Sequence, residues 1–211
     1  MKHAALAAIA ALSLAVTACV RPEPVEIGPG QPGAGSAGAP TAADSTGQAP
    51  ADAPWYAARL EALGFYVFPA PEPLPLFSVR TLDGKEAGVA DLAGKVVLLN
   101  FWATWCPPCR AEMPSIEALW KATRDEAFTV MAISVNEPKA TVTGFLKDNP
   151  YGYPMYLDET GEASAPFASR GIPTTFILDK QGRAIAGLVG SRSYDGPEVT
   201  GLIRELARKL P

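Results

Sequence analysis

Two cysteines separated by two residues, Cys106 and Cys109, are the side chains of this sequence best suited to chemistry. They lie in the segment Phe-Trp-Ala-Thr-Trp-Cys-Pro-Pro-Cys at positions 101–109, where a predicted strand ends and a predicted helix begins. At a helix start, the first thiol faces unpaired backbone N–H groups and the positive end of the helix dipole, which stabilise its thiolate. An exposed nucleophilic thiol with a resolving partner is typical of a redox centre.

A zinc site and a structural disulfide are the alternatives for this pair. A zinc ion would need two more soft ligands, and the sequence has only one further cysteine, Cys19, and one histidine, His3. A structural disulfide would suit an oxidising compartment, but a ring that spans four residues recovers little loop entropy. We therefore interpret the pair as redox-active, and we expect neither a metal site nor a cofactor.

The composition argues against two further classes of function. The 211 residues include 18 basic and 22 acidic side chains, a net charge of −4, so the dense cationic surface that binds nucleic-acid phosphates is not expected. His3 lies in a segment that is predicted to be removed. The mature chain would then have no histidine for a Ser-His or Cys-His nucleophile.

Residues 1–18 are predicted to be a signal peptide. Lys2 supplies a positive charge, and the apolar run over 4–16 is too short to span a bilayer. The sequence Val-Thr-Ala-Cys at 16–19 resembles the bacterial lipoprotein signal, in which Cys19 is lipidated and becomes the first residue. The alternative is an ordinary secretory signal that is cut after Ala18. Lipidation would anchor the chain to a membrane stably, because the cysteine carries more than one acyl chain.

Residues 19–54 are predicted to form a disordered tether, and residues 55–211 a folded domain. Between positions 20 and 54 there are seven prolines and six glycines, and no aromatic residue precedes Trp55. Such a segment cannot bury enough apolar surface to offset its ordering entropy. Together with a lipidated Cys19, it places the domain outside the cytoplasm, on the periplasmic side of a membrane or at the cell surface.

The domain is predicted to be α/β, with a mixed central sheet flanked by helices. The apolar runs 96–102 and 128–135 are typical of strands that are buried on both faces. Before the first of these strands, the predicted elements are a helix within 55–65, an extended stretch over 69–75 and a hairpin of 77–82 and 85–89. After it, we expect a helix with Met113, Ile116, Leu119 and Trp120 on one face, and later a helix opened by Pro138, a strand near 153–157 and a helix near 162–169. The chain then ends with a hairpin of 174–178 and 183–189 and a final helix capped by Asp195, which buries Leu202, Ile203, Leu206 and Leu210. Helices between buried strands predict a parallel sheet, here closed by an antiparallel hairpin.

The segment 101–109, together with Gly-Ile-Pro-Thr-Thr-Phe-Ile-Leu-Asp at 171–179, resembles the thioredoxin superfamily. More narrowly, it resembles the membrane-tethered TlpA/ResA/CcmG type of thiol-disulfide oxidoreductase, over about residues 70–211. The resemblance implies a thioredoxin-like fold with an N-terminal hairpin and an inserted strand-helix unit at 150–170. It also implies a protein disulfide as substrate and a membrane electron donor of the DsbD or CcdA type.

Individual site residues follow from the same resemblance. Cys106 becomes the attacking thiol and Cys109 the buried resolving thiol. Pro173 becomes a cis-proline that packs against the disulfide, and the neighbouring backbone at Ile172 faces an extended substrate. The other expected substrate contacts are Trp105, Pro107 and Pro108, whereas Trp102 belongs to the core and Pro114 is structural.

One departure from thioredoxin concerns proton transfer. Asn100 stands where thioredoxin has a buried aspartate, and an amide cannot take up the proton of Cys109. Glu112 matches a glutamate near the cysteines of ResA-like proteins, and we expect it to be the proton acceptor. The alternative is a first-turn acid that the helix dipole favours.

The two prolines between the cysteines bear on the direction of electron flow. Neither Pro107 nor Pro108 has an N–H, so only the Cys109 amide can donate to the Cys106 sulfur. We therefore expect the pKa of the Cys106 thiol to be about 7 or above, nearer that of thioredoxin than the strongly oxidising end of the range. A less stable reduced form makes a more reducing couple.

These expectations describe a lipid-anchored, monomeric reductase of protein disulfides, with the cysteines of apocytochrome c or of another metal-site assembly as candidate substrates. A dithiol oxidant is the main alternative, and the redox potential distinguishes the two. A thiol peroxidase is less favoured because its cysteine usually lacks a Cys-x-x-Cys partner. A Sco-like copper chaperone would need a histidine ligand, and a non-catalytic binding module would not depend on Cys106.

Overall fold

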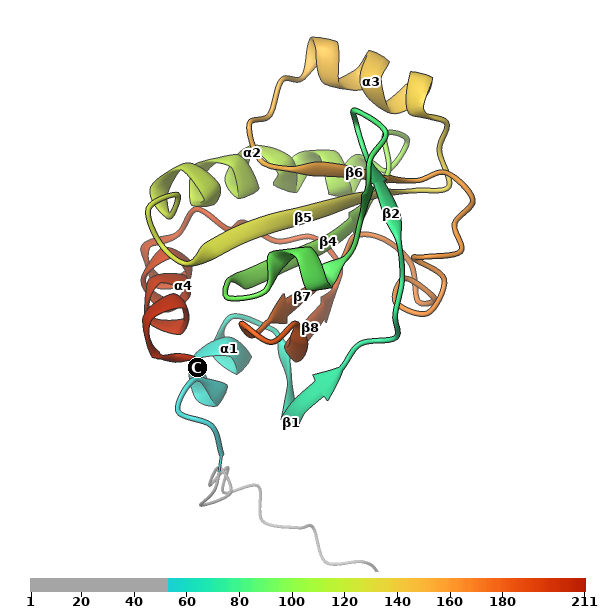
Figure 1. Cartoon of the computed structure of the whole chain (residues 1–211). Coiled ribbons are helices and arrows are strands. Elements are labelled where there is room, and N and C mark those ends of the chain that lie inside the picture. The colour runs from blue at the N-terminus through green and yellow to red at the C-terminus, as the bar shows by residue number, and fades with distance from the viewer. Residues whose placement is uncertain (1–52) are drawn as a thin grey trace, which may run out of the picture. The chain divides into compact units, whose positions relative to one another are not determined.

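The computed structural model describes residues 53–211, which form a mixed eight-stranded sheet with four α-helices (Figure 1). The predicted signal peptide, the lipidation site Cys19 and the tether up to residue 52 lie outside the described residues. The division of the chain into signal, tether and domain therefore stays a prediction. Within the described range, no helix is both long and apolar enough to cross a membrane.

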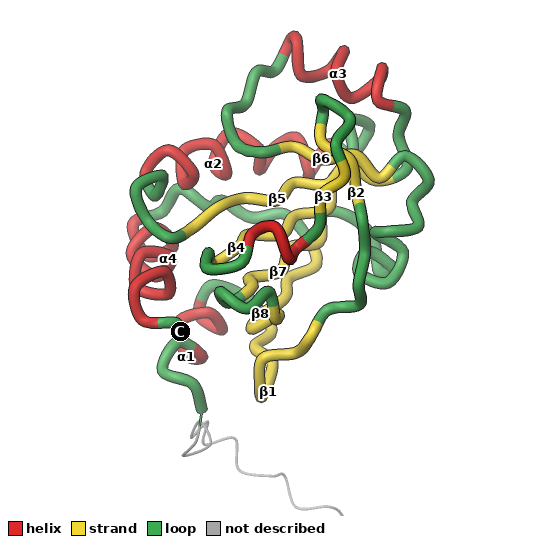
Figure 2. The backbone as a smooth tube through the Cα atoms, viewed as in Figure 1, coloured by secondary structure: helices red, strands yellow, loops and turns green. Residues whose placement is uncertain are grey.

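The elements follow one another as α1 (Ala57–Ala62), β1 (Tyr66–Pro73), β2 (Val79–Thr81), β3 (Glu86–Ala87), a 3-10 turn (Val89–Leu92), β4 (Val96–Trp102), α2 (Pro107–Ala122), β5 (Phe128–Val135), α3 (Lys139–Asp148), β6 (Met155–Asp158), β7 (Thr174–Leu178), β8 (Arg183–Val189) and α4 (Pro197–Lys209). In the sheet, their order is β1-β8-β7-β4-β5-β6-β2-β3. Figure 2 shows the short strand β3 beside β2.

The centre of the sheet agrees with the prediction. Strand β5 pairs in parallel with β4 and with β6, and the antiparallel hairpin β7–β8 joins on the other side of β4. All seven residues of β4 are buried, because both faces of this strand are covered. The thioredoxin-like arrangement is thereby confirmed.

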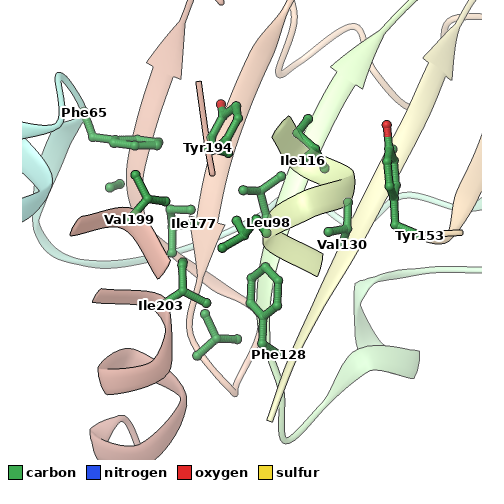
Figure 3. Packing of buried hydrophobic residues seen from close by; sticks show 14 of the residues in the cluster. Phe65, Leu98, Ile116, Phe128, Val130, Tyr153, Ile177, Tyr194, Val199 and Ile203 are labelled. Carbon is green, nitrogen blue, oxygen red and sulfur yellow. The ribbon is translucent and has the colours of Figure 1, made fainter. Parts of the chain in front are cut away.

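Alternate side chains of β4 enter two separate cores. Val96, Leu98 and Trp102 belong to a cluster that includes buried residues of all four helices. Figure 3 shows this cluster around Leu98, with Ile116 from α2 and Ile203 from α4 nearby. Val97, Leu99 and Phe101 point to the opposite face, where they meet side chains from the β2–β3 region and from the turns at 163–168.

The two edges of the sheet are extensions that the sequence predicted only in part. The expected hairpin of β2 and β3 is present, and it adds to β6 through β2. The proline-rich stretch is extended as expected, but it also pairs as β1 with β8, with an irregularity between Val67 and Glu72. Prolines cannot donate to a ladder, which is why a strand with three of them lies at an edge.

The helix predicted near 162–169 is wrong, because this segment forms a series of turns. Pro166 has no N–H to donate within a helix. The backbone N–H of Ser164 donates to the Asp158 carboxylate at 2.8 Å, and the Ser164 hydroxyl binds the same carboxylate. The inserted unit at 150–170 therefore consists of β6 followed by turns.

The predicted cap of the last helix is also wrong. Gly196 is the N-cap of α4, and Pro197 occupies the first turn. The Asp195 carboxylate instead accepts a hydrogen bond from the Ser193 hydroxyl at 2.7 Å. The predicted apolar face of the helix is confirmed, because its four leucine and isoleucine side chains are buried: Leu202, Ile203, Leu206 and Leu210.

Candidate active site

The cysteine pair lies at the first turn of α2, directly after the buried strand β4. Cys106 is the N-cap residue, and its sulfur forms a disulfide with Cys109, with an S–S distance of 2.08 Å. The Cys109 N–H points to the Cys106 Sγ at 3.2 Å. Because Pro107 and Pro108 have no N–H, this is the amide that was expected to face the sulfur.

The exposure of the two cysteines differs less than expected. Cys109 is 0% exposed, as a buried resolving thiol should be, but Cys106 is only 3% exposed. The backbone carbonyl oxygen of Ile172 lies 3.8 Å from the Cys106 Sγ and covers it from the side of β7. The accessible surface at the disulfide is therefore provided by its neighbours: Trp105, which is 67% exposed, and the exposed Pro107 and Pro108.

The loop that covers Cys106 precedes β7. The Ile172–Pro173 peptide bond is cis, as predicted. The Pro173 carbonyl accepts a hydrogen bond from the Gly190 N–H at 2.8 Å, and the Thr174 hydroxyl donates to the Gly171 carbonyl at 2.6 Å. These bonds fix the loop, and Ile172 stays partly exposed beside the disulfide.

Glu112 and Asn100 meet in the interior beneath this surface, and each is 2% exposed. The Asn100 Nδ2 donates to the Glu112 Oε1 at 2.8 Å. The Arg192 N–H donates to the Glu112 Oε2 at 3.3 Å. Burial raises the pKa of Glu112 to about 7, although the hydrogen bonds from Asn100, Arg192 and Ser191 oppose this rise. At neutral pH this carboxyl group can therefore both accept and release a proton.

Two hydroxyl groups extend this polar interior. The Asn100 Nδ2 also donates to the Thr175 Oγ1 at 3.0 Å, and the Tyr194 hydroxyl lies 3.0 Å from the same oxygen. Burial and the nearby Glu112 raise the pKa of Tyr194, so its hydroxyl remains neutral. Neither residue was predicted to be part of the site, although Thr175 lies within the segment 171–179; they lie 75 and 94 positions after Asn100.

Glu137 is a further buried acid that was not predicted to be part of the site. It is 3% exposed, and it accepts hydrogen bonds from the Thr104 N–H at 2.9 Å, from the Thr104 hydroxyl and from the Ser134 hydroxyl at 2.8 Å. Thr104 immediately precedes the Trp105-Cys106 pair, so Glu137 holds the loop that leads into α2. Because β4 and β5 are parallel, the residues that follow the two strands lie at the same end of the sheet. The position of Glu137 just after the predicted strand 128–135 was therefore a signal in the sequence that could have placed it near Thr104.

Trp102 is fully buried, as expected for a core residue, and its ring packs against Phe145 at a centroid distance of 5.7 Å. Its indole nitrogen is the one buried side-chain nitrogen or oxygen atom without a hydrogen-bond partner in the part of the chain that the structure describes.

Within residues 53–211 there is no group of three or more His, Cys, Asp or Glu side chains that could hold a metal ion. The chemistry that this site offers is thiol-disulfide exchange.

Comparisons with known proteins agree with this chemistry. A family model described as the AhpC/TSA family matches residues 71–185. A thiol-disulfide oxidoreductase ResA from Bacillus thuringiensis subsp. konkukian is 34% identical over 121 residues, which cover 57% of this chain and 70% of that protein.

Two solved structures extend the comparison to the fold. A thiol:disulfide interchange protein of the thioredoxin family from Chlorobium tepidum is 36% identical, with a TM-score of 0.54 over 64% of this chain and 97% of that one. A secreted thiol-disulfide isomerase from Corynebacterium glutamicum is 27% identical, with a TM-score of 0.59 over 69% of this chain and 91% of that one.

Proposed function

We infer the function from the premise that this chain belongs to the AhpC/TSA family and, within the thioredoxin superfamily, to the ResA-like thiol-disulfide oxidoreductases. We propose that it works as a reductase of protein disulfides, with Cys106 as the attacking thiol and Cys109 as the resolving thiol. One observation carries the proposal: Cys106 caps α2, its sulfur is linked to Cys109, and the cis Ile172–Pro173 loop lies against it.

The reaction takes two exchange steps from the reduced dithiol. The Cys106 thiolate attacks one sulfur of the substrate disulfide, forms a mixed disulfide and releases the other substrate sulfur as a thiol. The Cys109 thiolate then attacks the Cys106 sulfur and releases the second substrate thiol. Two electrons pass to the substrate, and the Cys106–Cys109 disulfide is left in the enzyme.

Glu112 takes the proton of Cys109 in the second step. The two residues are three positions apart on α2, so they lie one helical turn from each other. A carboxyl group with a pKa of about 7 is well matched to this transfer at neutral pH. Asn100 cannot exchange a proton, and its contribution is the hydrogen bond that orients the Glu112 carboxylate.

The substrate binds over the exposed side chains around the disulfide, namely Trp105, Pro107 and Pro108, and beside the backbone of Ile172 and Pro173. An aromatic ring that is 67% exposed next to a nucleophilic sulfur supports this assignment. The exposed ring offers apolar area to an extended polypeptide at little cost in conformational entropy.

The direction of electron flow and the location of the enzyme belong to the same proposal. The single amide that faces the Cys106 sulfur supports a reducing couple rather than a strong oxidant. The predicted signal peptide at 1–18, followed by Cys19, supports a lipoprotein outside the cytoplasm, and we propose that it acts as a monomer. A reductase there needs electrons from a membrane donor of the DsbD or CcdA type, and apocytochrome c is a fitting substrate.

A trapping experiment tests the proposed function. In the variant Cys109→Ser, the mixed disulfide on Cys106 cannot be resolved, so substrate proteins should remain attached through a bond that dithiothreitol releases. Mass spectrometry of the released proteins identifies them. The matched control, Cys106→Ser, should trap nothing. If both variants exchange disulfides with dithiothreitol and with protein substrates at the wild-type rate, the proposed roles of the two cysteines are wrong.

A further inference from the structure

The segment between β8 and α4 contributes two backbone amides to the buried side of α2. The Arg192 N–H donates to the Glu112 Oε2 at 3.3 Å, and the Tyr194 N–H donates to the Ser115 Oγ at 3.0 Å. The Ser115 hydroxyl in turn donates to the Glu112 backbone carbonyl at 2.7 Å. The hydrogen bonding of the Glu112 carboxylate therefore depends on where the backbone of this segment lies.

The side chain of Arg192 fixes the segment from the opposite side. Its guanidinium donates to the carbonyl oxygen of Leu63, and its Nε donates to the Ser193 carbonyl at 3.0 Å. The guanidinium carbon also lies 5.5 Å from the ring centroid of Phe65 and 5.6 Å from that of Tyr194, two residues that Figure 3 labels. A planar cation within reach of two aromatic rings, with two of its N–H groups bonded to backbone carbonyl oxygens, has little freedom to move.

Leu63 and Phe65 lie just after α1. Leu63 is the C-cap residue of this helix, and the last carbonyl groups of a helix have no partner within it. Arg192 supplies that missing partner. α1 is itself attached to the domain through the buried Leu60 and through an ion pair between Arg59 and Glu205. Both α1 and Arg192 lie outside residues 71–185, the range that the family model matches.

We propose that Arg192 is a positioning residue for the exchange reaction, and that α1 is the element that holds it. The guanidinium, bound at the C-terminal end of α1, keeps the backbone amide of the same residue on the Glu112 carboxylate. The importance of this contact for catalysis rests on the proposed function, in which Glu112 accepts the proton of Cys109. The contact itself is a feature of the structure and does not depend on that role. A hydrogen bond to a carboxylate favours the ionised form, so a looser contact makes Glu112 retain its proton to higher pH.

The other groups around Glu112 do not replace this contact. From β4, the neutral amide of Asn100 donates to the carboxylate, and Ser191 faces it from the same segment as Arg192. Burial, with a smaller effect of the Glu112 charge, raises the pKa of the tyrosines Tyr153 and Tyr194, so both remain neutral near pH 7. Because the Arg192 guanidinium binds the Leu63 carbonyl, its influence reaches Glu112 through the backbone amide.

A titration of Glu112 in the oxidised full-length protein tests the proposal. The carboxyl carbons are followed by NMR with 13C-labelled glutamate, and the Glu112 signal is assigned by its loss in Glu112→Gln. In Arg192→Met, the hydrocarbon stem remains but no donor reaches Leu63. We expect the pKa of Glu112 to rise by about 0.5 or more, roughly a threefold increase in proton affinity. Arg192→Lys keeps a cation and a donor and should give a smaller rise.

Arg204→Ala is the matched control. Arg204 also donates to a carbonyl at the end of a helix, that of Ala122 at 2.8 Å, but it makes no hydrogen bond to Glu112. Its removal should leave the titration of Glu112 unchanged. A folded Arg192→Met in which Glu112 titrates as in the wild type overturns the proposal.

A second variant covers the case in which Arg192→Met does not fold. Phe65→Leu keeps apolar volume at the end of α1 but removes one of the two rings beside the guanidinium. It should raise the pKa of Glu112 in the same direction, and an unchanged titration there counts equally against the proposal. Because the titration needs no turnover, a shifted Glu112 in a chain that reduces no protein disulfide would refute the proposed function, but it would still show that Arg192 holds its backbone amide on the Glu112 carboxylate.

Discussion

Glu112 is a carboxyl group with almost no access to water. In place of the lost hydration, its carboxylate has hydrogen bonds from neutral donors. Asn100 and the Arg192 amide stabilise its charged form, but they do not fully replace the lost hydration. A negative charge beside the cysteines is therefore available only part of the time at neutral pH. This is the property that a proton acceptor for the second thiol needs.

The pH dependence of stability should report this group directly. Burial raises the pKa of Glu112 from its ordinary value of 4.5 to about 7, so between these values the folded protein holds a proton that the unfolded chain has lost. Folding is then favoured at low pH, and stability falls as pH rises through this range. We expect the free energy of unfolding to decrease by about 2–3 kcal/mol more between pH 5 and pH 8 in the wild type than in Glu112→Gln.

Urea denaturation of both proteins in the oxidised state, at several pH values, measures this difference. The comparison with Glu112→Gln removes contributions from the other titrating groups. Parallel stability curves for the two proteins would show that Glu112 is already ionised at pH 5.

The same substitution has a kinetic consequence for the proposed mechanism. Without a proton acceptor, Cys109 must lose its proton to solvent, and its attack on the mixed disulfide should slow by about 10²-fold at pH 7. The rate should recover as pH rises toward the pKa of a free thiol. Stopped-flow measurement of the resolution step between pH 6 and pH 9 checks this, and a profile identical to the wild type contradicts the role of Glu112.

At the scale of elements, the start of α2 is held from two sides. The loop before β7 lies against the Cys106 sulfur, and Glu137, after β5, binds the residue that precedes Trp105. Glu137 has a buried carboxylate whose partners are one amide and two hydroxyl groups. Both contacts exist because β5 and β7 are the two neighbours of β4 in the sheet.

Removal of Glu137 should therefore cost stability and disturb the redox site together. Glu137→Ala leaves three donors without an acceptor, two on the half-buried Thr104 and one on the buried Ser134, and we expect a loss of about 3 kcal/mol in the free energy of unfolding. Glu159→Ala is the control, because Glu159 accepts one exposed amide, that of Lys139 at 2.8 Å, and its loss should cost less than about 1 kcal/mol. Equal losses in the two variants would show that the loop is held by other contacts.

At the scale of the whole molecule, the folded residues 53–211 contain the complete cysteine pair and its surroundings. The predicted lipidation site lies far upstream of them in sequence. Membrane attachment and redox chemistry are thus expected to be separable, since every site residue that the structure describes lies within 53–211.

The substitution Cys19→Ser tests this separation. The lipid is attached to the Cys19 sulfur in the predicted signal, so the variant should be missing from the membrane fraction after expression with its own leader. Its Cys106–Cys109 couple, measured against glutathione, should keep the wild-type potential. A Cys19→Ser protein that still sediments with membranes would contradict the predicted lipoprotein.

The sequence alone determined the elements whose patterns are local. Strands β4 and β5 were predicted with the bounds that the structure shows, because a strand covered on both faces has a continuous apolar run that few other elements share. The cysteine pair at the start of α2 followed from a short motif, and the cis-proline before β7 followed from the resemblance to the thioredoxin superfamily. The predicted helix near 162–169 failed because Pro166 and the Asp158 carboxylate, which binds Ser164, together favour turns.

The tertiary structure alone decided what surrounds the cysteines. Glu112 was a candidate from its position, but its environment depends on Asn100, Thr175 and Arg192, which are brought together from β4, β7 and the segment before α4. The same holds for the covering of Cys106 by the Ile172 carbonyl. A spacing of three residues fixes which groups share a helical turn, whereas contacts across 60 to 80 residues depend on the strand order of the sheet, which no local pattern encodes.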